Sequence, residues 1–328
     1  PEPIRLTMYY SDKVANDVPH FKSYANRVKE MLTEIARASG GKVKFEVVNP
    51  EPFSDAEDKA VQAGLVGVPT GRAGERFYFG LVGVNSTDQQ QTIPFFDPGK
   101  ENFLEYDVTR LVYLLSNPEK KTVGLMTWLP LQGMDMSPMG GRGVPPWQIL
   151  EQMKELFTVK TIENSAKEIP DDVNVLMVVH PKSMSKETQY AIDQFVMRGG
   201  RLLLFVDPLC DQDVPPGMNP MQAMNMPKSS ELNTLLNAWG VEMDAGKIAA
   251  DRDNALRVGV GTQNRPEAVD YIAWLQLGKG DINESDPVTG SLNNSMILAT
   301  AGVLKAKEGA TTTFQPLVHT SKNSMELD

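Results

Sequence analysis

The chain has 328 residues and carries 32 Lys and Arg against 42 Asp and Glu, which gives a formal net charge of −10. This acidic balance argues against nucleic acid as a partner, because phosphate binding needs a basic surface, and it disfavours broad contact with anionic lipid. The single cysteine, Cys210, excludes an intramolecular disulfide and any CxxC redox or zinc site.

The length allows two domains. No apolar run approaches the roughly 18 residues of a membrane-spanning helix. The chain begins at Pro1 without a methionine and shows no signal peptide. We therefore expect it to be a domain of a longer protein.

The first 117 residues alternate between strand and helix patterns. Short apolar runs predict strands at residues 4–10, 43–48, 77–84 and 91–95, and helical spacing of apolar residues predicts helices at 21–35, 54–61 and 104–115. This order of elements resembles the thioredoxin fold. Because no cysteine lies near the first helix, such a domain has no redox pair and cannot exchange disulfides.

The segment Gly67-Val68-Pro69-Thr70 resembles the loop that holds a cis-proline in thioredoxin-like folds. Pro69 is therefore a candidate cis-proline, since cis peptide bonds occur almost only before proline. The alternative is that Pro69 ends a loop in the ordinary trans form, and both readings stay open.

A polar break at residues 117–121 predicts the domain boundary, which divides the chain into residues 1–117 and 118–328. In the second domain we expect strands at 122–128, 159–162, 173–179 and 201–206 and helices at 147–157, 185–198 and 230–239. The central strand-helix-strand unit contains two near-continuous apolar runs, 173–179 and 201–206. Such runs are typical of parallel strands that are buried on both faces. Short strands are expected at 241–249, 256–260, 296–299 and 312–320.

Polar and aromatic residues stand where these parallel strands end. Parallel sheets bind ligands beyond the carboxyl ends of their strands, and Trp128, His180 and Asp207 occupy such ends. His180 and Asp207 could face each other as an acid–base or ligand pair. The alternative is that Asp207 accepts hydrogen bonds from loop backbone while His180 closes a strand. Cys210 follows a strand end without the Gly-x-Cys-x-Gly turn of a nucleophile, so a buried thiol is its alternative.

Two long loops, residues 129–146 and 211–228, concentrate methionine. Both leave the carboxyl edge of the same predicted sheet, so we expect them to be neighbours. Methionine forms adaptable apolar surface, which favours a partner-binding surface, whereas packing within the loops and Cu(I) binding are the alternatives. The methionines of this predicted surface include Met134, Met136, Met139, Met218, Met221 and Met224. We expect no catalytic residues, no metal and no cofactor.

Several motifs follow one another along the chain: Phe79-Gly80-Leu81-Val82, Ile93-Pro94-Phe95, Leu104-Glu105-Tyr106-Asp107-Val108-Thr109, Gly199-Gly200-Arg201-Leu202-Leu203 and Val206-Asp207-Pro208-Leu209. In this order they resemble the soluble region of gliding-motility-type ABC-transporter auxiliary proteins (GldG-like). The resemblance implies an α/β protein with a thioredoxin-like domain and then a class I amidotransferase-like (flavodoxin-like) domain built on a parallel sheet. It also implies a location on the extracytoplasmic (periplasmic) face of the cytoplasmic membrane, as a soluble part of a membrane-anchored parent beside an ABC permease and ATPase. The family brings no catalytic residues with it.

These observations favour a non-catalytic extracytoplasmic auxiliary domain of an ABC transport system, which binds a protein partner or an envelope component. Two alternatives stay open. One is a hydrolase or amidotransferase-like enzyme that uses Cys210, or His180 with Asp207. The other is a small-ligand sensor that binds a saccharide against Trp128 or Trp147 at the strand ends.

Overall fold

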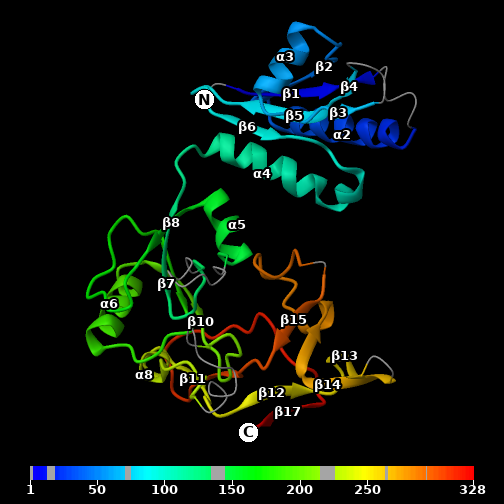
Figure 1. The fold of residues 1–328 in the computed structure, drawn as a ribbon. Coiled ribbons are helices and arrows are strands. Elements are labelled where there is room, and N and C mark those ends of the chain that lie inside the picture. Colours follow the sequence, from blue (N-terminus) through cyan, green and yellow to red (C-terminus); the bar gives the residue numbers. More distant parts are fainter. Residues whose placement is uncertain are drawn as a thin grey trace, which may run out of the picture. The chain divides into compact units, whose positions relative to one another are not determined.

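A computed structural model describes residues 3–12, 19–70, 75–133, 145–214, 226–262, 265–292 and 294–328 of the chain. The chain divides into two units, Pro1–Lys120 and Lys121–Asp328. Figure 1 shows the ribbon of both units, coloured along the sequence.

The first unit is built on a four-stranded sheet with the order β2-β1-β5-β6. β1 and β2 run parallel, whereas β5 is antiparallel to both β1 and β6. The elements of this unit are β1 (Ile4–Tyr10), α2 (Pro19–Ala38), β2 (Val43–Val48), α3 (Asp55–Gln62), β3 (Val68–Pro69), β4 (Arg76–Phe77), β5 (Phe79–Val84), β6 (Gln90–Ile93), η1 (Pro98–Phe103) and α4 (Leu104–Ser116).

Helices cover both faces of this sheet. Successive residues of a strand point to opposite sides, so β1 contributes side chains to a core on each face. Leu6 and Met8 of β1 belong to one core, together with buried residues of α2 and α4. Tyr9, the residue after Met8, points to the other face and packs in a second core with Ala60 of α3. The continuous apolar sequence of β5 follows from its place in the middle of the sheet, where both faces are buried.

Pro69 is in the trans form, so its prediction as a cis-proline was wrong. No cis peptide bond occurs among the described residues. Val68 and Pro69 instead form the short strand β3, which pairs antiparallel with Phe77 and Arg76 of β4. The Val68–Pro69 bond thus has the trans form that most X-Pro bonds adopt. The extended backbone of these two residues allows them to pair with β4.

The second unit contains a four-stranded parallel sheet with the order β10-β9-β7-β8. Its elements are β7 (Thr122–Thr127), α5 (Gln148–Leu156), β8 (Thr158–Thr161), β9 (Val175–Val179), α6 (Lys186–Met197), β10 (Arg201–Phe205) and α8 (Asn233–Ala238). Ser185 caps α6, because its Oγ accepts the N–H of Thr188 at 3.1 Å. The predicted parallel strand-helix-strand unit is therefore confirmed.

β10 departs from the prediction of a strand buried on both faces. It is the edge strand of the sheet, and its residues alternate between the two sides. Leu202 and Leu204 pack against the core under α6 and α8. Leu203 and Phe205 point the other way and are 47% and 49% exposed. An apolar run alone does not distinguish an edge strand from a central one.

The remainder of the second unit is antiparallel. It contains β11 (Val241–Met243), β12 (Ile248–Asp251), β13 (Ala255–Thr262), β14 (Arg265–Leu277), η2 (Lys279–Asp281), β15 (Met296–Ala299), β16 (Leu304–Ala306) and β17 (Ser324–Leu327). β13, β14 and β15 form one sheet, and β11–β16 and β12–β17 form separate pairs. The strand expected at residues 312–320 is wrong, since only Val318 makes an isolated bridge, to Ile282. Pro316 interrupts that threonine-rich segment and has no N–H for a ladder.

No helix in the described parts of the chain is both long and apolar enough to cross a membrane.

Candidate functional site

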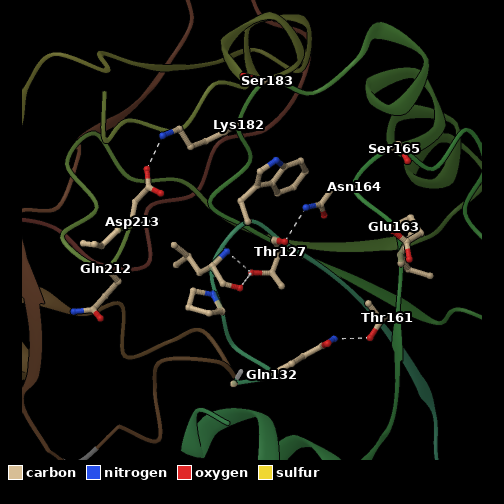
Figure 2. Close-up of a pocket in the computed structure, with 16 residues that line it drawn as sticks. Thr127, Gln132, Thr161, Glu163, Asn164, Ser165, Lys182, Ser183, Gln212 and Asp213 are labelled. Carbon is tan, nitrogen blue, oxygen red and sulfur yellow. Dashed lines mark hydrogen bonds and ion pairs between the residues drawn. The ribbon is translucent and has the colours of Figure 1, made fainter. Parts of the chain in front are cut away.

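The parallel sheet of the second unit carries a pocket beyond the carboxyl ends of its strands. β7 ends at Thr127 and β8 at Thr161, and both of these threonines line the pocket, which has a volume of about 710 Å³. We call it the edge pocket (Figure 2). It is lined by Thr127, Trp128, Leu129, Pro130, Gln132, Gly133, Thr161, Ile162, Glu163, Asn164, Ser165, Lys182, Ser183, Gln212, Asp213 and Val214.

Two side-chain amides in the pocket wall are held by hydrogen bonds. Gln132 donates from Nε2 to Oγ1 of Thr161 at 2.6 Å, and Asn164 donates from Nδ2 to the carbonyl oxygen of Thr127 at 2.9 Å. Figure 2 shows both bonds as dashed lines along the wall formed by the ends of β7 and β8. Each bond uses the amino half of the amide, so the orientation of the carbonyl half is set as well.

The opposite wall holds an ion pair. Lys182 donates from Nζ to Oδ2 of Asp213 at 2.5 Å and to the carbonyl oxygen of Pro227 at 2.7 Å. The Lys182 and Asp213 side chains are less than one-fifth exposed. Burial raises the pKa of Asp213, but the hydrogen bond from Lys182, together with the Lys182 charge and the nearby His180 imidazole, outweighs this effect and holds the pKa below its usual value.

His180 lies behind this ion pair and is 2% exposed. Its Nδ1 lies 3.0 Å from Oγ of Ser230, and its Nε2 lies 3.4 Å from Oδ2 of Asp213. The second contact is within electrostatic reach, although Nε2 makes no hydrogen bond in the described structure. The backbone of His180 has a φ of 50°, in the left-handed region that non-glycine residues seldom adopt.

Asp207 is joined to the same serine. Its N–H donates to Oγ of Ser230 at 2.9 Å, and its Oδ1 accepts the N–H of Leu209 at 2.8 Å. Burial raises the pKa of Asp207, and the hydrogen bond from Leu209 and the charge of His180 only partly offset this. Within the described residues, His180 and Asp207 make no direct hydrogen bond and meet through Ser230 instead.

Cys210 is 5% exposed, and its N–H donates to the carbonyl oxygen of Lys228. Burial, and then the nearby charge of Asp207, raise the pKa of the thiol. A thiol in this setting is mostly protonated at neutral pH and is a weak nucleophile.

The structure brings Trp128 into the wall of the edge pocket but leaves His180 and Asp207 outside its lining. The methionines of the predicted partner surface, Met134, Met136, Met139, Met218, Met221 and Met224, lie outside the described residues. Among the residues that are described, no group of three or more His, Cys, Asp or Glu is arranged to hold a metal ion.

Sequence reasoning missed Gln132, Asn164, Lys182, Asp213 and Ser230. Lys182 had a usable signal, since it follows the end of β9 by three residues, and pocket residues gather after strand ends. The other four stand in loops without periodicity, and the pairs they form join distant parts of the chain. No pattern within a short stretch of sequence predicts such pairs.

Comparison with known proteins adds family information. Residues 120–328 match the model of a family described as an ABC-type uncharacterized transport system, and residues 1–84 match a domain of unknown function. A protein of Borreliella burgdorferi described as uncharacterized is 22% identical over 346 aligned residues, which cover 99% of this chain and 61% of that relative. The chain thus spans about three-fifths of the length of this curated relative. No solved structure matches the chain. Because the first family model covers well over half of its residues, the chain belongs to the ABC-type uncharacterized transport system family.

Proposed function

We propose that this chain is a non-catalytic, extracytoplasmic auxiliary domain of an ABC transport system, and that it binds a protein partner or an envelope component. The family match over residues 120–328 carries the proposal. The parent protein would hold the domain at the periplasmic face of the cytoplasmic membrane, next to the permease and ATPase.

The order of the elements supports the finer assignment of the two folds. A sheet ordered β2-β1-β5-β6, with only β1 and β2 parallel, agrees with a thioredoxin-like domain. A parallel sheet with α6 and α8 on one face and α5 on the other agrees with an amidotransferase-like domain. In the first domain no thiol is present, because the one cysteine of the chain is Cys210. That domain would therefore serve as a binding shell and not as a redox enzyme.

The proposed partner surface is formed by the methionines of the two long loops. Residues 134–144 and 215–225 carry the six methionines of the predicted surface, and they continue from Gly133 and Val214. Gly133 and Val214, the described residues that precede these segments in the sequence, both line the edge pocket. Adaptable thioether side chains suit a surface that contacts another protein there.

The state of the potential reactive groups supports a non-catalytic role. Cys210 is buried and has a raised pKa, which opposes formation of the nucleophilic thiolate. His180 is engaged with Ser230 beneath the pocket wall, and Ser230 is itself 2% exposed. A substrate would have to displace these contacts before it reached either group.

Co-purification of the tagged parent protein tests the proposal. An ABC permease and an ATPase should be retained with the wild-type protein. Replacing Met221 and Met224 together by Asp should reduce their capture several-fold and leave the melting temperature unchanged. Met197→Asp is the matched control, because Met197 is 74% exposed at the end of α6, away from both segments in the sequence. A parent protein that retains neither transporter subunit would contradict the proposal.

A further inference from the structure

We infer that the edge pocket is a binding site for a neutral saccharide. The inference rests on the proposed function and makes it more specific, because it names the chemical class of the envelope component that the domain would hold. Four properties of the pocket lead to it: its fixed hydrogen-bonding groups, its aromatic wall, its charge balance and its size.

The fixed amides leave acceptors for a ligand. Gln132 and Asn164 each use a side-chain N–H on the protein. No hydrogen bond from any described residue reaches their carbonyl oxygens, Oε1 and Oδ1. Thr161 accepts from Gln132 and keeps its own hydroxyl proton to donate. Acceptors and a donor on one wall match a ligand whose hydroxyl groups both donate and accept.

Trp128 supplies an apolar surface beside these polar groups. An indole has a large flat face. Fixing the side chain in one orientation costs little conformational entropy, because it has only two rotatable bonds. A sugar ring presents C–H groups on its faces and hydroxyls around its edge. An aromatic face next to oriented amides therefore fits both halves of a saccharide.

The charges of the described lining residues disfavour anionic ligands. Among these residues are the carboxylates of Glu163 and Asp213 and one ammonium group, that of Lys182. Lys182 is already bound to Asp213 and to the carbonyl oxygen of Pro227. An anionic ligand would therefore meet an excess of negative charge from these residues. A purely apolar ligand would bury the amide groups without partners, which is costly.

The volume suits a ligand of more than one ring. The pocket measures about 710 Å³, and small-molecule sites span about 300–1,000 Å³. The pocket is bounded by the segments that follow all four strands of the parallel sheet, β7, β8, β9 and β10. We therefore choose trisaccharides as probes.

Titration of the chain with neutral trisaccharides (maltotriose, cellotriose and tri-N-acetylchitotriose) followed by tryptophan fluorescence tests the inference. At least one should give a saturable change and raise the melting temperature, while trigalacturonate, which is anionic, should give neither. Gln132→Ala and Asn164→Ala should each weaken binding about tenfold. Trp128→Phe should weaken it less, since part of the aromatic face remains.

Gln276→Ala is the matched control for these variants. Gln276 is exposed and donates from Nε2 to Oγ of Ser295 at 3.2 Å, so it repeats the Gln132 arrangement outside the pocket. Its replacement should leave affinity unchanged. The inference fails if no neutral trisaccharide binds, if trigalacturonate binds as well, or if binding survives both amide variants. Transporter capture without saccharide binding would overturn this inference alone, whereas saccharide binding without capture would overturn the transport role and leave the site standing.

Discussion

The imidazole of His180 and the hydroxyl of Ser230 lie 3.0 Å apart, although 50 residues separate them in the sequence. Ser230 also accepts the N–H of Asp207 through Oγ, and its own N–H donates to the carbonyl oxygen of Asp207. These bonds connect the end of β9, the end of β10 and the segment that leads into α8. Ser230 thus joins three parts of the second unit that support the edge pocket.

Ser230→Ala should destabilise the second unit by about 1–3 kcal/mol, because it leaves a buried imidazole nitrogen and a buried N–H without their partner. Urea unfolding monitored by tryptophan fluorescence reports on this unit alone, since all 4 tryptophans of the chain lie at positions after 120. Ser291→Ala, at an exposed serine of the same unit, should change the free energy of unfolding by less than about 0.5 kcal/mol. Equal effects of the two replacements would show that Ser230 is not a structural link.

Asp251 should make the second unit sensitive to acid. It is 1% exposed and holds the last strand in place by accepting bonds from Ser321 N–H and Oγ at 2.6 Å and from Asn254 Nδ2 at 3.0 Å. Burial raises the pKa of Asp251, but these hydrogen bonds lower it by more, so the pKa lies below its usual value. A carboxylate whose folded pKa lies below the unfolded one, about 3.9, stabilises the fold above that pH, and the contribution is lost as pH falls through the folded pKa.

Asp251→Asn should therefore cost about 1–3 kcal/mol at neutral pH and flatten the loss of stability below about pH 4. The measurement is the free energy of unfolding in urea at several pH values, again from tryptophan fluorescence. Asp171→Asn is the control, since the Asp171 side chain is 93% exposed and its ion pair with Arg198 contributes little. An acid transition that stays unchanged in Asp251→Asn would contradict the assignment.

Asp207 should respond to pH in the opposite sense. Burial raises its pKa above the usual value, so the folded state disfavours its charged form. Its unfavourable contribution grows as pH rises from the unfolded pKa, about 3.9, through the folded one. Asp207→Asn keeps an acceptor for the N–H of Leu209 and removes the buried charge. The variant should thus be as stable as the wild type or more stable at neutral pH, and the difference should shrink in acid. A clear loss of stability at neutral pH would instead mean that the carboxylate has an essential partner.

Cys210 offers a test of accessibility in a chain with a single thiol. Because it is 5% exposed and its pKa is raised, alkylation by iodoacetamide in the folded chain should be at least about a hundredfold slower than in urea, which corresponds to an opening free energy of about 2.8 kcal/mol. Mass spectrometry counts the modified fraction directly. Rapid stoichiometric labelling of the folded chain would revive the enzymatic alternative for this residue.

The sequence predicts most of the strands in the two four-stranded sheets and the helices that cover them. Within each of these elements, buried apolar residues recur at helical or strand spacing. It does less well after Val241. β14 begins at Arg265, contains Pro266, and carries Glu267 and Asp270, all of which argue against a strand. The strand exists because it pairs along its length with β13, where Asp270 lies opposite Arg257. Pairing of that kind is a property of two segments and not of one.

The candidate site divides in the same way. The position of Trp128 beyond β7 follows from the rule that parallel sheets bind ligands at the carboxyl ends of their strands, and the sequence shows where that strand ends. The bond from Gln132 to Thr161 and the ion pair of Lys182 with Asp213 depend on how loops return over the sheet edge. Tertiary packing determines the path of these loops. The sequence therefore shows which residue types the loops contain but not which residues they bind.

The two glycines of β5, Gly80 and Gly83, allow a last test, on the first unit. A Cβ at Gly80 would lie 2.7 Å from the carbonyl oxygen of Ile93 and 3.0 Å from that of Pro94, and backbone atoms cannot move aside cheaply. A Cβ at Gly83 would approach only the ends of leucine side chains, at 2.5 to 3.1 Å, which can change rotamer. Gly80→Ala should thus destabilise the first unit by about 1–3 kcal/mol, and Gly83→Ala should cost less. Hydrogen exchange of the β1 and β5 amides measures both effects, because this unit contains no tryptophan. A larger loss of stability in Gly83→Ala would contradict this prediction. It would mean that the leucine side chains of α4 cannot change rotamer to accommodate the added methyl group.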